Sequence, residues 1–311
     1  MLEDDNVNTV TSSSFDYRAQ RFQSVCLAWG LEQLRPLVGR WEVPQDLWQQ
    51  LVGAASIYGA RCLGEPASWR DLDETLDAYR DRRTNVTPNG ALVPKFEFQL
   101  EYNLVLAAWF KVFGSMIAPR PDLVRDIRTT PNIRVKFAEE LSDNEARALN
   151  TAIPHSDAWV EGPWGFNCYV PLLGDVLNNT LLYWNIDEDS FRDEFLTANP
   201  SYFENQWVLE HIEPDYGLQT PSGYVYLSDF AVVHATTRKP GARARMSIDT
   251  TVMVGDHEVH PDRTDEYVQE LPAIGVRDFV VIGRSERDAV GEKTTEFSHY
   301  LTGSRRTVQL P

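Results

Sequence analysis

The first third of the chain has the hydrophobic spacing of helices. Apolar residues recur at steps of three and four along residues 47–58, which places most of them on one helix face. A longer and more apolar stretch, residues 96–113, predicts a further and more deeply buried helix. Residues 1–14 are polar and rich in Ser, Thr and Asn, and we expect them to form a loose tail. Residues 1–130 are therefore predicted to be a helical region.

The pattern changes after residue 130. Residues 132–137 alternate polar and apolar positions, which is the two-residue period of a strand. Further short strand candidates follow, separated by turn residues, at 165–173, 179–185, 223–229, 230–238, 242–254 and 277–283. One helix, at about 190–198, interrupts them. Many short strands without regular intervening helices predict a sandwich or barrel. The expected fold is mainly β: a jelly roll over residues 131–311, supported by the helical region as one folding unit.

Three residues of the β-rich part have the chemistry of a metal site. His155 and Asp157 lie two positions apart in IPHSDAW, and in an extended strand both would project from one face. Pro154 restricts the backbone just before them. His234, inside a later strand candidate, can supply a second imidazole. Two imidazoles and one carboxylate form the facial triad of non-haem Fe(II) oxygenases, which leaves positions open for a co-substrate and O2.

Plainer interpretations of these histidines exist. A His-x-Asp pair occurs often by chance, and a hydrogen-bonded histidine at a strand end is the ordinary alternative. His211 is the substitute for His234, although its acidic neighbours indicate a solvated edge. His257 and His260 lie in a polar loop, and His299 has no evident partner.

The strand candidate at 242–254 carries a possible anion site. Counting alternate positions puts Arg243, Arg245 and Ser247 on one face. A buried-facing arginine is costly unless it meets an anion. A dicarboxylate such as 2-oxoglutarate supplies one: the Arg245 guanidinium matches its distal carboxylate and Ser247 adds a hydroxyl. Arg243 is a second candidate, with a surface role as the alternative. Asn167 could reach the co-substrate or the substrate, or serve only as a structural hydrogen-bonding residue.

Composition limits the partners. The chain has 29 Lys+Arg against 46 Asp+Glu, a formal net charge of -17, which disfavours nucleic acid and anionic membranes. The same charge favours a neutral or cationic small-molecule substrate, although Arg134 and Lys136 could locally reverse this. Three scattered cysteines predict no disulfide framework. The acidic N-terminus is unlike a signal peptide, so a cytoplasmic location is expected.

Four segments together resemble the Fe(II)/2-oxoglutarate-dependent dioxygenases: IPHSDAW, FNCYVPLLGDVLNNTLLYWN, GYVYLSDFAVVHA and RMSID. Within this superfamily they are most similar to the phytanoyl-CoA-hydroxylase-like and streptomycin-biosynthesis-type branch, over about residues 131–254. The resemblance implies a cupin-like double-stranded β-helix, with Fe(II) on His155, Asp157 and His234. It implies 2-oxoglutarate on Arg245 with Ser247.

The same resemblance implies oxidation, by default hydroxylation, of a small natural-product substrate. That branch often has a second arginine a few residues after the first, where this chain has Thr251. Two other functions remain open: a cupin-like metalloenzyme that does not use 2-oxoglutarate, such as an isomerase or epimerase, and a non-catalytic jelly-roll module that binds a ligand. A zinc hydrolase is less favoured, because no general base is evident near the pair. The sequence predicts no oligomeric state.

Overall fold

The computed structural model describes residues 15–64, 69–82, 85–87, 89–139, 153–196, 202–257, 261–283 and 305–311. Its α-helices are α1 (Phe15–Trp29), α2 (Gln45–Leu63), α3 (Leu72–Thr75), α4 (Gln99–Ile117) and α5 (Ala158–Glu161). Short 3-10 segments are η1 (Trp69–Asp71), η2 (Leu76–Arg82), η3 (Phe96–Phe98), η4 (Pro121–Leu123), η5 (Asp193–Leu196), η6 (Gln206–Glu210) and η7 (Pro261–Glu266). The predicted tail, residues 1–14, lies outside the described residues.

The strands form two main antiparallel sheets and a separate two-stranded sheet. The large sheet has the order β1-β2-β8-β5-β10-β3-β11, with β4 also paired to β10, and the small sheet has the order β7-β6-β9. The strands of the large sheet are β1 (Glu32–Arg35), β2 (Val38–Glu42), β3 (Val124–Arg128), β4 (Asn132–Lys136), β5 (Phe166–Gly174), β8 (Tyr224–Asp229), β10 (Arg245–Val254) and β11 (Tyr267–Val268). The others are β6 (Asn179–Asn185), β7 (Glu213–Pro214), β9 (His234–Arg238) and the antiparallel pair of β12 (Asp278–Ile282) with β13 (Arg305–Gln309).

The path of the chain identifies the fold as a jelly roll. From β5 onward the chain alternates between the two sheets: β5, β8 and β10 belong to the large sheet, while β6, β7 and β9 belong to the small one. This alternation winds the chain into a double-stranded β-helix, which confirms the predicted fold class. Because side chains alternate along each strand, every strand sends one set of residues between the sheets and the other set outward.

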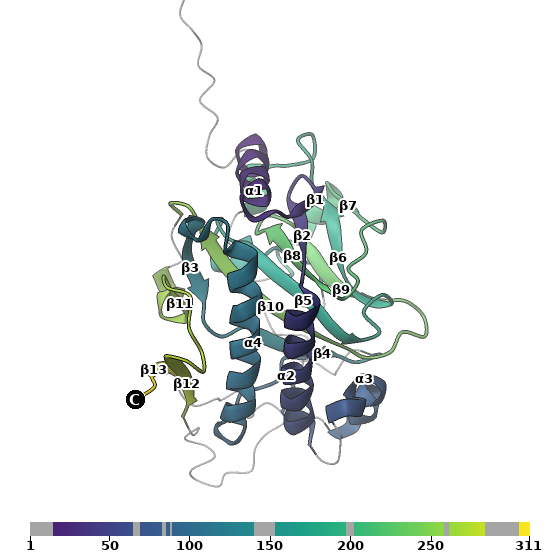
Figure 1. Cartoon of the computed structure of the whole chain (residues 1–311). Helices are drawn as coiled ribbons and strands as arrows, with labels where there is room; N and C mark the ends of the chain where they lie inside the picture. The colour runs from purple at the N-terminus through teal and green to yellow at the C-terminus, as the bar shows by residue number, and fades with distance from the viewer. Residues whose placement is uncertain are drawn as a thin grey trace, which may run out of the picture.

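Helices α2 and α4 cover the outer face of the large sheet (Figure 1). Both predicted helical stretches are confirmed, and the spacing of their apolar residues produces their buried faces, as in Leu51, Ala55 and Tyr58 of α2. A side chain on Gly59 of α2 would collide with Met246 of β10, so the glycine allows the helix to approach the sheet closely. The outward set of β10 thus packs under helices, and its alternate residues face the interior of the roll.

The first third of the chain is less purely helical than its sequence predicts. It also contains the hairpin β1–β2 and strand β3, and β2 pairs with β8 while β3 pairs with β10. The helix expected at 190–198 is reduced to η5, and residues 197–201 lie outside the described part of the chain. Strand β10 begins at Arg245, three residues later than predicted. No helix among the described residues has the length and apolar character needed to cross a membrane.

Candidate metal centre and co-substrate cavity

A polar cavity of about 220 Å3 opens between the two sheets. Both sheets line it, the large sheet through β4, β5 and β10 and the small sheet through β6 and β9. Its lining includes the predicted residues His155, Asp157, Asn167, His234, Arg245 and Ser247. Six candidates from four separate segments of the sequence therefore meet around one space.

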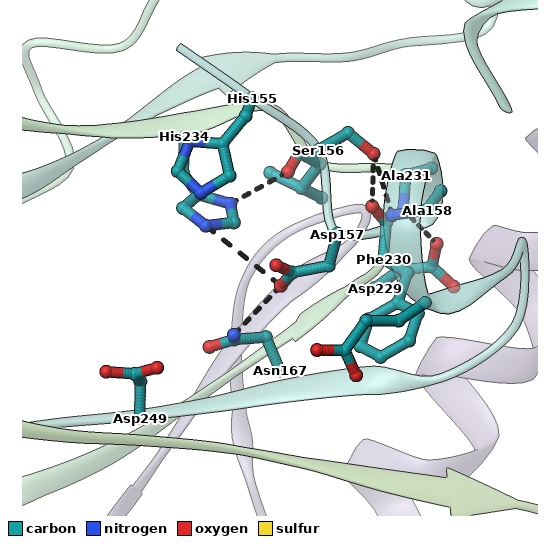
Figure 2. A network of polar contacts seen from close by, with 12 residues as sticks. His155, Ser156, Asp157, Ala158, Asn167, Asp229, Phe230, Ala231, His234 and Asp249 are labelled. Carbon is teal, nitrogen blue, oxygen red and sulfur yellow. Dashed lines mark hydrogen bonds and ion pairs between the residues drawn. The ribbon is translucent and has the colours of Figure 1, made fainter. Parts of the chain in front are cut away.

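The two histidines are placed side by side by backbone pairing. His155 and His234 form an isolated antiparallel β-bridge in which each amide N–H donates to the other residue's carbonyl, at 3.0 and 2.9 Å. Directly paired residues on neighbouring strands project to the same side of the sheet. The two imidazole rings accordingly lie with their centroids 4.5 Å apart, and both residues are buried (Figure 2).

Backbone carbonyls orient both rings toward the cavity. The Nδ1 atom of His155 lies 2.9 Å from the carbonyl of Ile153, and the Nδ1 atom of His234 lies 3.1 Å from that of Val232. Because a carbonyl only accepts, each Nδ1 carries the proton and each Nε2 keeps its lone pair for a metal ion. Burial lowers the pKa of His155 well below its ordinary value, and the adjacent His234 acts in the same direction. His155 is therefore a neutral ligand donor at physiological pH.

Asp157 reaches the same space by a different backbone route than predicted. His155 takes part in the bridge, but Asp157 has helical backbone angles (φ -63°, ψ -25°) and immediately precedes α5. The two side chains converge because the chain turns after the bridge, and not because they alternate along one strand. Ser156 secures this turn by donating its hydroxyl proton to the carbonyl of Phe230 at 2.6 Å, which links the turn to the segment that leads into His234 (Figure 2).

These three residues fit a divalent transition metal. One ligand atom from each of His155, Asp157 and His234 lies within 4.8 Å of the others. Among the described residues this is the one group of three or more His, Cys, Asp or Glu side chains arranged in this way. Two neutral imidazole nitrogens and a carboxylate oxygen are the donor set of non-haem Fe(II) sites. The donor types and their convergence on one side of a cavity therefore match the predicted facial triad.

The other histidines lie elsewhere. His211 is exposed, and its ring contacts the rings of Phe195 and Trp207. His257 is stacked on Trp164, with ring centroids 4.1 Å apart. His260 and His299 lie outside the described residues. The distal histidine of the described cluster is thus His234, and His211 does not replace it.

Arg245 is a buried cation whose hydrogen-bond acceptors are neutral groups. The residue is 2% exposed. Its guanidinium donates to the hydroxyl of Tyr169, to Asn179 Oδ1 at 3.4 Å and to Thr236 Oγ1 at 3.4 Å. Within the described part of the chain no carboxylate lies within ion-pair distance of it. Burial lowers the pKa of Arg245, although Tyr169 opposes this effect. A fully charged guanidinium without an anion is expensive to bury, so this end of the cavity is suited to bind an anion.

Of the two residues predicted to lie on the same face as Arg245, Ser247 lines the cavity and Arg243 does not. Ser247 is buried and lines the cavity two positions after Arg245, as the alternation of strand residues predicts. Arg243 is exposed and does not line the cavity. The prediction treated Arg243 as a strand residue on the same face as Arg245. Strand β10 begins only at Arg245, so the alternation of side chains does not apply to Arg243. The structure thus corrects the placement of Arg243.

The polar residues between these two regions include Arg134 and Lys136, which the sequence offered only as weak candidates with solvent exposure as the alternative. Arg134 holds Asp249 through both carboxylate oxygens, at 2.5 and 3.1 Å, and Asn132 donates to the same carboxylate at 3.0 Å. Burial acts to raise the pKa of Asp249, but Arg134 and Asn132 outweigh it and leave this pKa below its ordinary value. The alternation of polar and apolar residues along β4 was the sequence signal for this part of the site, since it placed Arg134 and Lys136 on one polar face. That face turns into the cavity and not toward solvent.

Asn167 holds the metal-site carboxylate, and its loss should weaken the binding of metal. Its Nδ2 donates to Asp157 Oδ2 at 2.9 Å (Figure 2). We expect Asn167→Leu to weaken Fe(II) binding about 10- to 100-fold, the usual effect of removing a residue that orients a ligand. Asn132→Leu is the matched control, because that asparagine holds Asp249 instead. Equal Fe(II) dissociation constants for the two variants, measured anaerobically by calorimetry, would contradict the assignment.

Neither a protein-family model nor a curated protein sequence matches this chain. It is similar to the solved structure of AviO1 from Streptomyces viridochromogenes, with a TM-score of 0.41 and 12% identity over 77% of this chain and 97% of that one. An N-substituted L-amino acid dioxygenase from Burkholderia ambifaria has a TM-score of 0.38 and 12% identity over 76% and 88% of the two chains. The non-haem α-ketoglutarate-dependent epimerase SnoN from nogalamycin biosynthesis has a TM-score of 0.37 and 12% identity over 76% and 82%.

Proposed function

We propose that this chain is a non-haem Fe(II)- and 2-oxoglutarate-dependent dioxygenase that oxidises a small molecule, most simply by hydroxylation. One observation carries the proposal. A cluster of two imidazoles and one carboxylate shares a cavity with a buried arginine that has no carboxylate partner among the described residues. The cluster supplies ligands for one metal ion, and the arginine supplies a counter-charge for a dicarboxylate. Together they match a metal and a co-substrate that bind in the same space.

Two groups of residues would have separate roles, one in binding the metal and the other in binding the co-substrate. His155, Asp157 and His234 would hold Fe(II) from one side, which leaves its remaining positions facing the cavity. Arg245 and Ser247 would hold the distal carboxylate of 2-oxoglutarate and so orient its keto acid end toward the metal. Bound Fe(II) would supply the activation of O2, with one oxygen atom used to convert 2-oxoglutarate to succinate and CO2 and the other available to oxidise a C–H bond of the substrate. A natural-product substrate rests on the sequence resemblance alone.

Aromatic and apolar residues help to shape the space around the metal ligands. The ring of Tyr202 stacks on His155 with centroids 4.5 Å apart, and the two planes are inclined by 21°. Leu181 and Val160 supply apolar surface in the same cavity. Such contacts restrict rotation of the His155 ring and displace water from one side of the site, which strengthens the electrostatic interactions inside it.

Two alternatives explain fewer of these features. A cupin-like isomerase or epimerase without 2-oxoglutarate would use the triad but would leave the buried charge of Arg245 without a function. A non-catalytic jelly-roll module could use Arg245 to bind an acid, but it would not need three convergent metal donors. The dioxygenase is favoured because it gives both features a role.

The test is a titration of 2-oxoglutarate into the anaerobic Fe(II)-loaded protein. We expect a metal-to-ligand charge-transfer absorbance that saturates at about one 2-oxoglutarate per chain, followed by succinate formation when O2 is admitted. Metal bound without this absorbance would favour the cupin-like alternative. Failure to bind metal at all would favour the ligand-binding module.

A further inference from the structure

One part of the cavity is not used by the proposed metal and co-substrate sites. Along β10 the residues that face the cavity are Arg245, Ser247, Asp249 and Thr251. At about 3.3 Å per residue, Thr251 lies roughly 20 Å along the strand from Arg245. Thr251 is paired across the sheet with Asn167, the residue that holds Asp157. The Thr251 end of the cavity is therefore beside the metal ligands and remote from the proposed carboxylate anchor.

Arg128 brings a guanidinium to this end. It is the last residue of β3, whose neighbour Ile127 pairs with Val252 of β10, so Arg128 lies beside Thr251. Its Nη2 lies 2.7 Å from Glu266 Oε2, whereas Nη1 lies at the longer distance of 3.5 Å from Glu161 Oε1. Its Nε is buried and has no hydrogen-bond partner in the described part of the chain. Arg128 thus keeps donor capacity although its side chain is only 12% exposed.

Glu161 completes a polar group around this arginine. It is 8% exposed, ends the short helix α5 that follows Asp157, and lines the cavity. The hydroxyl of Tyr267 donates to Glu161 Oε2 at 2.9 Å, and the same hydroxyl lies 2.5 Å from Thr251 Oγ1. Because these residues come from α5, β10 and β11, their positions are fixed by three separate elements. A ligand here would meet a cation and an acceptor close together.

The charge of the cavity lining is opposite to that of the chain. Among the described residues that line it, four are cationic and three are anionic: Arg128, Arg134, Lys136 and Arg245 against Asp157, Glu161 and Asp249. Fe(II) and the 2-oxoglutarate dianion would add +2 and -2, so the lining stays at 4 - 3 = +1. Nearby charges matter more than distant exposed ones, which salt screens over about 8–10 Å. The chain's net charge of -17 therefore does not decide the charge of the substrate.

We propose that Arg128 binds the carboxylate of the substrate, and that Glu161 accepts a hydrogen bond from an amine or hydroxyl group of the same molecule. The inference rests on the proposed dioxygenase function and narrows its substrate class to small amino or hydroxy acids. The cavity volume of about 220 Å3 is below the ~300–1,000 Å3 of sites that hold drug-sized ligands, which disfavours a coenzyme A ester. The chain's overall acidity had favoured a neutral or cationic substrate, and the lining of the cavity reverses that expectation.

The test compares acids with their amides on the anaerobic Fe(II)- and 2-oxoglutarate-loaded protein. The probes are a panel of L-amino acids and 2-hydroxy acids, each beside its primary amide. We expect some of the acids, and not their amides, to shift the charge-transfer absorbance and to stimulate succinate formation when O2 is admitted. Arg128→Met should raise the dissociation constant of the most effective acid at least about 30-fold, because one partner of a shielded charge pair is lost. The same variant should change the dissociation constant of 2-oxoglutarate less than about twofold.

Controls separate recognition from folding. Arg125→Met removes an arginine of the same strand that does not line this cavity, and it should leave the binding of the acid unchanged. Arg128→Lys keeps the charge and should retain part of the affinity. The inference is overturned if amides act as well as acids, if no acid shifts the absorbance, or if Arg128→Met weakens 2-oxoglutarate and acid equally. Absence of the charge-transfer absorbance itself would instead overturn the proposed function, and this inference with it.

Discussion

Replacing any one of His155, Asp157 and His234 by alanine should abolish turnover that depends on 2-oxoglutarate and weaken Fe(II) binding by roughly 100-fold or more. Loss of a residue that only orients a ligand already costs about 10- to 100-fold, so loss of a ligand itself should cost at least as much. Water can fill the vacated position on the metal, but it is not anchored to the protein. The measurement is anaerobic Fe(II) binding by calorimetry, together with succinate formation under O2.

His211→Ala is the matched control for this first prediction. His211 is exposed, its ring packs against the rings of Phe195 and Trp207, and it does not line the cavity, so its loss should leave both Fe(II) affinity and turnover near those of the unmodified protein. Full activity in His234→Ala combined with loss in His211→Ala would mean that the distal ligand has been assigned to the wrong residue.

Arg245→Met should raise the dissociation constant of 2-oxoglutarate about 30-fold or more while leaving Fe(II) bound. Removing one partner of a desolvated charge pair costs ~2–5 kcal/mol, which corresponds to that loss of affinity or a larger one. Methionine keeps much of the side chain's length and apolar surface, so the change mainly removes the charge and its donors. The charge-transfer titration measures the effect directly.

Two comparisons show whether Arg245 binds a ligand or only supports the fold. Without 2-oxoglutarate, Arg245→Met should lower the melting temperature only slightly, because the buried guanidinium loses hydrogen bonds to three neutral groups but no carboxylate partner among the described residues. Arg243→Met should leave the dissociation constant unchanged, because that residue is exposed and lies outside the cavity. A large loss of stability in the apo Arg245→Met protein, with 2-oxoglutarate affinity preserved, would assign Arg245 a structural role.

Local sequence patterns predicted the individual helices and strands better than they predicted how these elements pair and pack. The apolar spacing in residues 47–58 and 96–113 corresponds to α2 and α4, and alternation after residue 130 corresponds to most of the core strands. The hairpin β1–β2 was not predicted, because its strands of four and five residues have too little alternation to be recognised. Its place in the large sheet depends on pairing with β8, a segment nearly two hundred positions away.

For the site, too, the identities of the residues were predicted better than their arrangement in space. The identity and spacing of the residues predicted His155, Asp157 and His234 as metal ligands, because imidazole and carboxylate groups are metal donors and the two-residue spacing suggested a shared face. The reason given for their convergence was only partly correct. His155 faces His234 through a bridge, while Asp157 comes from a turn secured by Ser156. Both features depend on hydrogen bonds between segments far apart in the chain.

The sequence by itself therefore determined most of the secondary structure of the core, the donor types of the metal site, and the alternation that turns Arg245 and Ser247 toward one side. These are properties of neighbouring residues. The tertiary structure alone decided that Arg243 lies outside the cavity, that Arg134 is paired with Asp249, and that Arg128 and Glu161 meet beside the metal ligands. Those outcomes depend on where strands begin and which strands pair, and such long-range contacts are set by the packing of the whole chain.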